Sequence, residues 1–197
     1  VPYPTRGQIA AGTMDADLTP LVWLEDEVEA FFVHVQGSTR VRLQDGETIR
    51  IGFAGKTGHP YSSIGRHMRE TGIVPEGGLG MRGIRDYLRD RPDELRDILD
   101  VNRSYIFFRE IDGLPPELGP IGAEGLPLTP KRSLAVDSDL YGYGLPIFVD
   151  ADLGRLGIFR QLTIAQDTGS AIKGPARGDL FWGTGAEAGE QAGNVQA

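Results

Sequence analysis

One segment near the C-terminal end, residues 161–183 (QLTIAQDTGSAIKGPARGDLFWG), changes character every few residues, and this constrains the fold strongly. Its residues 162–165 predict a short apolar strand. Residues 167–170 have the composition of a turn, and residues 171–173 predict a second extended run that a Gly-Pro pair ends. The segment therefore predicts short strands joined by turns.

Asp179 lies in this segment, directly before the apolar run of residues 180–182. A carboxylate placed before buried aromatic side chains loses part of its hydration, which favours the protonated form. A general acid must carry a proton at neutral pH, so the position suits one. The alternative is that Asp179 and Asp167 are ordinary turn acids, and the pattern alone favours this alternative because aspartate is common in turns.

Composition agrees with a fold built from short elements. The 28 glycines and 13 prolines in 197 residues predict many turns rather than a helical bundle, and the length allows one or two domains. The net charge of −8 argues against a nucleic-acid partner, since phosphate binding needs a positive surface. The absence of cysteine excludes disulfides and thiolate metal sites.

The first half of the chain predicts an α+β domain at residues 10–105. Residues 25–35 have apolar side chains on one helical face and acids in the first turn, so they predict a helix that ends at Gly37. Two alternating runs flank an Asp-Gly pair and predict a β-hairpin. The remaining predictions are helices at residues 5–11, 63–70, 80–90 and 92–101, strands at residues 21–24 and 104–109, and a loop at residues 55–60.

The second half, residues 106–197, predicts an all-β domain. Residues 111–130 contain four glycines and five prolines and predict an irregular connector. Two short strands are predicted at residues 133–136 and 147–149, and residues 183–197 predict coil with a single helical turn.

Two chemistries can be set aside from the motifs. The histidines, His34, His59 and His67, have none of the spacings typical of zinc sites, so no metal site is predicted. No serine lies in a GxSxG motif, which argues against a serine hydrolase. Carboxylate chemistry on sugars fits better, because glycosidases work with carboxyl groups as acid, base or nucleophile.

Three motifs in the second half resemble the three-aspartate domain of the membrane-bound lytic murein transglycosylase A family. They are SLAVD with Asp137, QDTGSAIKG with Asp167, and GDLFWG with Asp179. In the first half, VEAFFVHVQGSTRVRL, GKTGHPYSSIG and NRSYIFFRE extend the resemblance, which covers about residues 4–193. Ser170 departs from it, since it stands where the family usually has glycine.

The resemblance implies a mainly β fold with an α+β insert. The second domain would be one half of a six-stranded double-psi β-barrel, the first a smaller α+β domain inserted into it, with a substrate groove between them. It also implies a cofactor-free lytic transglycosylase that cuts peptidoglycan between N-acetylmuramic acid and N-acetylglucosamine. In that chemistry one aspartate, here Asp179, acts as acid and base and a 1,6-anhydro ring forms, while Asp137 and Asp167 support the acid.

The groove residues predicted to contact the glycan are Gln36, Gly37, Ser38, Tyr61, Lys173 and Trp182. The amide and hydroxyl side chains can hydrogen-bond to sugar groups, and Gly37 permits close approach to the backbone. Aromatic faces stack on pyranose rings. The alternative for Trp182 is a tryptophan of the core, given its apolar neighbours.

By resemblance the protein would be periplasmic and associated with the outer membrane of a Gram-negative bacterium. The family's upstream part, with export signal, lipid attachment and first barrel strands, is expected to be missing, as is a final strand past Ala197. Membrane contact would then occur only through a lipid anchor on that upstream part. A second function remains open: a non-catalytic polysaccharide-binding barrel module similar to expansins. An acid before an apolar run favours the enzyme, because a binding module does not need one.

Overall fold

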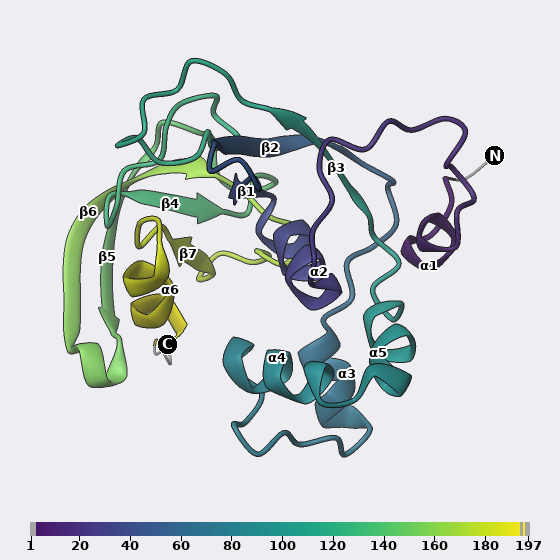
Figure 1. The fold of residues 1–197 in the computed structure, drawn as a ribbon. Helices are drawn as coiled ribbons and strands as arrows, with labels where there is room; N and C mark the ends of the chain where they lie inside the picture. The colour runs from purple at the N-terminus through teal and green to yellow at the C-terminus, as the bar shows by residue number, and fades with distance from the viewer. Residues whose placement is uncertain (1–2, 194, 196–197) are drawn as a thin grey trace. The chain divides into compact units, whose positions relative to one another are not determined.

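The computed structural model describes residues 3–193 and 195, and the chain divides into two units, Val1–Asp112 and Gly113–Ala197. The first unit combines an antiparallel sheet with helices, and the second is built on a mixed sheet (Figure 1). The chain therefore has the mixed architecture, mainly β with helices, that its sequence predicts. No helix within the described residues is long and apolar enough to span a bilayer.

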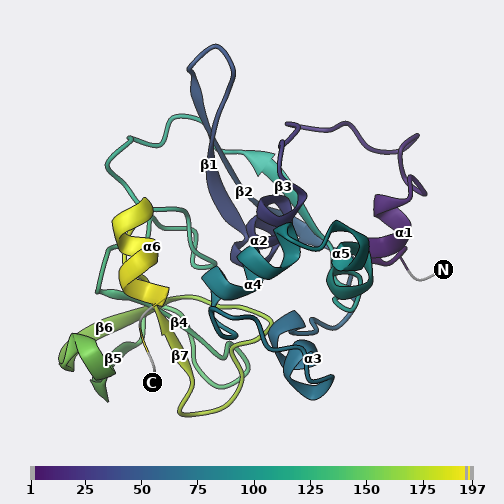
Figure 2. The same cartoon turned by 60° about the horizontal axis from the view of Figure 1, so that its bottom comes forward.

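The sheet of the first unit has the order β1-β2-β3, formed by β1 (Ser38–Arg42), β2 (Thr48–Lys56) and β3 (Ile106–Glu110). The predicted hairpin joins β1 and β2, and Gly46 adopts the left-handed conformation (φ 91°) that its turn requires. The hairpin tip points away from the helices (Figure 2). Because β2 runs to Lys56, part of the predicted loop at residues 55–60 is strand.

β3 pairs with β2 and therefore lies in the first unit. The sequence predicts that the second domain begins at residue 106, because the composition changes just after this strand. Strand pairing over a long sequence separation, rather than composition, fixes where the unit ends.

Three helices of the first unit begin at residues whose side chains cap them. Asp26 caps α2 (Glu27–Gln36) by accepting from the backbone N–H groups of Val28 and Glu29, and Gly37 ends this helix with φ 76°. The other helices are α1 (Arg6–Ala10), α3 (Ile64–Glu70), α4 (Met81–Arg89) and α5 (Pro92–Leu99), with Thr5 and Ser63 as caps of α1 and α3. These five helices agree with the predicted ones to within two residues at each end.

The core of the first unit is a single cluster contributed by α2, α3, α4 and α5. Met68 and Leu88 are fully buried in it, and Phe31 and Phe32 pack edge to face. The predicted strand at residues 21–24 is wrong, because no described strand pairs with this segment and the Trp23 side chain is 86% exposed. An apolar run without a hydrogen-bonding neighbour does not form a strand.

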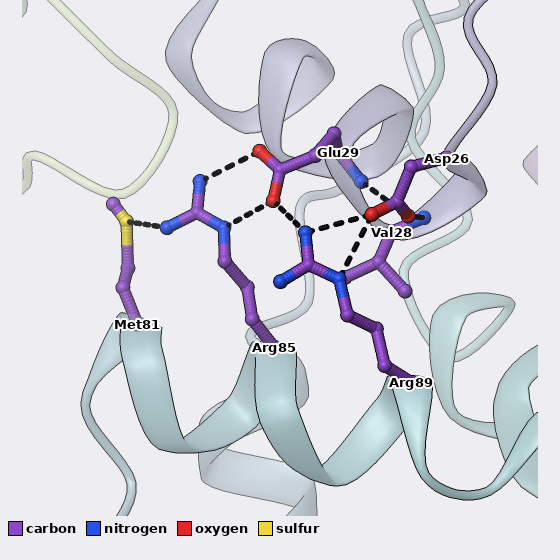
Figure 3. A network of polar contacts seen from close by, with 6 residues as sticks. All are labelled: Asp26, Val28, Glu29, Met81, Arg85 and Arg89. Carbon is purple, nitrogen blue, oxygen red and sulfur yellow. Dashed lines mark hydrogen bonds and ion pairs between the residues drawn. The ribbon is translucent and has the colours of Figure 1, made fainter. Parts of the chain in front are cut away.

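An ion-pair network fastens α4 to α2 (Figure 3). Arg89 contacts Asp26 at 2.7 Å and Glu29 at 2.6 Å, and Arg85 contacts Glu29 at 2.9 Å. The Arg85 guanidinium also lies 4.2 Å from the centroid of the Phe32 ring. The N-cap residue of α2 thus both satisfies its own helix and binds the neighbouring one.

The second unit contains a sheet of order β5-β6-β4-β7. Its strands are β4 (Ser133–Val136), β5 (Pro146–Asp152), β6 (Ile158–Asp167) and β7 (Gly178–Leu180). β4 is parallel to β6 and antiparallel to β7, while β5 and β6 form a long curved hairpin (Figure 1). β5 and β6 exceed the predicted strands, because pairing with each other continues past their apolar centres.

Two predictions for the second unit are wrong. Residues 171–173 are not extended: they lie in the turns between β6 and β7, and only the Ile172 side chain is buried. The predicted coil at residues 183–197 contains α6 (Ala186–Gly193), a helix longer than the single turn expected. Residues 194, 196 and 197 of that prediction lie outside the described residues.

Candidate active site around three aspartates

The sheet register brings the three motif aspartates to the same end of the sheet in the second unit. Ala135 of β4 pairs with Asp167 on one side and with Asp179 on the other. Two strand spacings separate those aspartates, which corresponds to about 10 Å between their backbones. Asp137 follows β4 by one residue, at the end where parallel β4 and β6 both finish. The motifs, far apart in sequence, thus meet in one place.

Asp137 is a buried carboxylate, and its partners fix it in place. Its side chain is 7% exposed; Oδ2 accepts from the Gly174 N–H at 2.8 Å, and Oδ1 lies 2.9 Å from Lys173 Nζ. The Gly174 N–H and then the Lys173 ammonium lower the pKa of Asp137 below its ordinary value. Its role is consequently to hold the loop between β6 and β7.

Further contacts secure the same loop. Lys173 Nζ lies 2.6 Å from Asp139 Oδ2, the Thr168 hydroxyl donates to the Val136 carbonyl at 2.8 Å, and Tyr141 Oη donates to the Pro175 carbonyl at 2.6 Å. Lys173 was predicted to bind glycan; in the structure it is engaged by two carboxylates. The loop that leads into Asp179 is therefore attached at both of its ends.

Asp167 is the last residue of β6. The sequence predicted instead that it belongs to the following turn. Its Oδ1 accepts from the Ala123 N–H at 3.0 Å, so it ties the connector to the sheet. Burial raises the pKa of Asp167, although the N–H groups of Thr168 and Ala123 partly offset this. Asp167 is thus the aspartate of the three whose pKa burial raises, whereas the hydrogen bonds of Asp137 lower its pKa.

The environment of Asp179 differs from the one that the sequence predicts. The sequence predicted a desolvated carboxylate, but its side chain is 52% exposed, and its Oδ1 lies 2.9 Å from Nη2 of Arg177. The reason is topological: β7 is a three-residue strand at the edge of the sheet, and the apolar residues after it are themselves only partly buried. The exposure does not follow from the neighbours of Asp179 in sequence.

Trp182 is partly buried beside a pocket of about 350 Å³ in the second unit, so it is not a fully buried core residue. The ammonium of Lys131 lies 5.1 Å from the centroid of its ring. Leu153, Leu156, Ile158, Phe159, Gln161 and Gln191 complete the lining of this pocket. The pocket thus places the Trp182 ring beside mainly apolar side chains and two amide groups.

The other predicted glycan contacts lie in the first unit. Gln36, Gly37 and Ser38 are consecutive: they end α2, form its left-handed cap and begin β1. Tyr61 lies between β2 and α3, and burial raises the pKa of its phenol. In the same unit, His34 of α2 meets the Tyr105 ring edge to face, with 4.4 Å between the ring centroids. The structure thus places Gln36, Gly37, Ser38 and Tyr61 in the first unit and Lys173 and Trp182 in the second.

Three residues that contact the site were not predicted from the sequence: Arg177, Asp139 and Tyr141. Arg177 had a signal, because residues two apart in an extended chain point to the same side, and Arg177 stands two residues before Asp179. Asp139 and Tyr141 had none that separates them from ordinary loop residues, since their partners are more than thirty positions away.

Comparison with known families agrees with this arrangement. The MltA specific insert domain matches residues 1–109, and the 3D domain matches residues 132–197. Among curated proteins, the membrane-bound lytic murein transglycosylases A of Vibrio cholerae and Escherichia coli K12 are 33% and 32% identical over 98% and 96% of this chain. The chain covers 53% of each, so it spans about half the length of these relatives.

Solved structures show the same relationship. The membrane-bound lytic murein transglycosylase from Agrobacterium tumefaciens superposes with a TM-score of 0.89 at 44% identity, over 98% of this chain and 54% of that one. MltA from Neisseria gonorrhoeae gives 0.83 at 46% identity, over 99% and 50%. E. coli MltA with bound chitohexaose gives 0.82 at 29% identity, over 98% and 58%. Both units thus have counterparts there, and the chain belongs to the membrane-bound lytic murein transglycosylase A family.

Proposed function

We propose that the protein carrying this chain is a peptidoglycan lytic transglycosylase with Asp179 as its acid and base. The observation that carries the proposal is the contrast in accessibility among the three aspartates. Asp137 is 7% exposed and Asp167 holds the connector, whereas the Asp179 side chain is 52% exposed and can be reached by a glycan. Only an accessible carboxyl group can transfer a proton to a polymer.

In the proposed reaction, protonated Asp179 donates its proton to the oxygen that links C1 of N-acetylmuramic acid to N-acetylglucosamine. The C1–O bond breaks, and the oxygen of the muramyl C6 hydroxyl bonds to C1. Asp179, now a carboxylate, takes the proton from that hydroxyl and returns to its starting state. No water is consumed, and the products are a 1,6-anhydromuramyl end and a free 4-hydroxyl.

The structure around Asp179 supports this role through rigidity. A proton donor must be held within hydrogen-bond reach of the bond that it protonates. The loop before β7 is held by Asp137, which binds Gly174 and Lys173. Asp167 holds the other flank of the sheet through Ala123. These two aspartates are therefore positioning residues in our proposal.

For substrate binding we propose that Gln36, Gly37, Ser38 and Tyr61 of the first unit, and Lys173 and Trp182 of the second, contact the glycan. The bound chitohexaose in the E. coli relative supports a glycan ligand. We further propose that the sheet of the second unit is part of a double-psi barrel, and that the protein is periplasmic and membrane-associated. The names of the relatives, membrane-bound murein transglycosylases of Gram-negative bacteria, support this location.

The test is product analysis with the intact natural protein that contains this chain. Digestion of purified murein sacculi followed by mass spectrometry should yield anhydro-muropeptides. Reducing-end products would instead identify a hydrolase. Intact sacculi together with retained glycan binding would favour the alternative, a non-catalytic polysaccharide-binding module.

A further inference from the structure

The ion pair between Arg177 and Asp179 is not explained by the reaction alone. Nη2 of Arg177 lies 2.9 Å from Oδ1 of Asp179, and both side chains are 52% exposed. The guanidinium occupies one of the two carboxylate oxygens through which the proposed reaction passes its proton. Arg177 must therefore leave Asp179 for both oxygens to face the substrate.

Resting on the proposed function, we propose that Arg177 is a specificity-determining residue that exchanges Asp179 for a carboxylate of the muramyl substituent. The substrate class is then an acidic glycan, in which the ring to be cut carries a lactyl or lactyl-peptide group with a free carboxylate. Binding of that carboxylate by Arg177 frees the Asp179 oxygen to face the glycosidic bond. A neutral glycan of N-acetylglucosamine cannot make this exchange.

The chemistry of arginine favours such an exchange. Its planar guanidinium recognises carboxylates through up to two parallel hydrogen bonds, and the two groups compete here for one cation. The existing pair is exposed on both sides, and exposed pairs are weak, so a second carboxylate can displace the first at low cost. A lactyl carboxylate is suited to do so because its substituent is on the same sugar ring whose C1–O bond breaks.

Other cations of the second unit are less suited to this role. Lys173 is held by two carboxylates, Asp137 at 2.9 Å and Asp139 at 2.6 Å, one of them buried. Lys131 lies over the Trp182 ring. In a protein of net charge −8, an acidic substrate needs a local cation near the acid, and Arg177 adjoins it directly.

The experiment measures binding of three probes to the intact natural protein by isothermal titration calorimetry. The probes are a muramyl glycan strand with free carboxylates, the same strand with its carboxylates converted to amides, and neutral chitohexaose. The parent should bind the acidic strand about tenfold more tightly than the amidated one, as expected for a charged hydrogen bond. Arg177→Ala should remove this preference and leave chitohexaose affinity within about twofold of the parent.

Two further variants make the result specific. Arg177→Lys keeps the charge without the planar fork and should restore part of the preference. Arg160→Ala removes a comparable exposed ion pair in the same unit, 3.0 Å from Asp150, and should leave the preference unchanged.

The exchange is refuted if the parent does not distinguish the acidic from the amidated strand, or if Arg177→Ala keeps the distinction. Release of anhydro product by the parent is measured in a separate assay. Its absence would sink the proposed catalytic function, whereas the binding preference would still decide the role of Arg177.

Discussion

The neutral state of His34 should make folding of the first unit sensitive to mild acid. This side chain is largely buried, with its ring 4.4 Å from Tyr105 and 5.1 Å from Phe108, and its Nδ1 accepts from the Ile106 N–H at 3.3 Å. Burial, and secondarily the charge of Arg6, lower the pKa of His34 from 6.5 to about 3. An accepting Nδ1 fits the neutral ring.

The direction of the pH effect follows from the difference in proton binding between the folded and the unfolded chain. Between about pH 3 and pH 6.5 the unfolded chain binds a proton at His34 that the folded chain does not, so the free energy of unfolding falls as the pH drops through this window. From about pH 7 to about pH 5 the loss should be about 2 kcal/mol, at about 1.4 kcal/mol per pH unit below the unfolded pKa. This range stays above the ordinary titration of the carboxylates.

Urea unfolding followed by far-UV circular dichroism measures the effect at both pH values. His34→Asn keeps an acceptor near the Ile106 N–H but cannot be protonated, so most of the difference between the two pH values should vanish. Val28→Ala, on the same helix, is the matched control, because it weakens the core and keeps the histidine. If His34→Asn loses as much stability in acid as the parent does, the buried neutral histidine is not the cause.

Three further substitutions test individual contacts in the two units. Gly119→Ala should lower the free energy of unfolding by about 1–3 kcal/mol, because its Cβ would overlap a backbone carbonyl, whereas Gly142→Ala, in open space, should have little effect in a thermal melt. Asp167→Asn keeps an acceptor for the Ala123 N–H without the desolvated charge. Since a raised pKa makes ionisation costly to the folded state, this variant should exceed the parent in stability at neutral pH, and the gap should close in acid. Arg89→Ala should cost at most about 1 kcal/mol, less at high salt, because the pairs it breaks are partly exposed; an equal cost in urea titrations at low and high salt would contradict this.

Local chemistry made much of the first unit predictable from the sequence. An acid directly before α2, a serine before α3 and an Asp-Gly pair between β1 and β2 each determine backbone geometry within a few residues. The same reasoning failed at residues 21–24, where strand formation depends on a distant pairing partner that the fold does not supply. Partners across the sheet likewise set the lengths of β5 and β6.

The site shows the same limit. The motifs identify Asp137, Asp167 and Asp179, but sequence gives no information about which carboxylate is exposed. Burial depends on strand order: β7 lies at the edge of the sheet, so Asp179 is accessible, while Asp137 faces a loop that returns to it from residues 173–174. The expectation that aromatic neighbours would desolvate Asp179 failed for this reason.

The most direct test of the central claim compares the products of Asp179→Asn and of the parent on murein, with glycan binding measured on the same samples. Asparagine keeps the shape of the side chain but cannot deliver or accept the proton, and in the proposed reaction one group performs both steps. The loss of anhydro-product release should therefore exceed the roughly 10²–10⁴-fold expected for one acid or base, with chitohexaose affinity close to that of the parent. Asp150→Asn, which changes another exposed, ion-paired aspartate of the same unit, is the control and should stay active. Anhydro-product release by Asp179→Asn at a rate near that of the parent would contradict the assignment of Asp179 as acid and base.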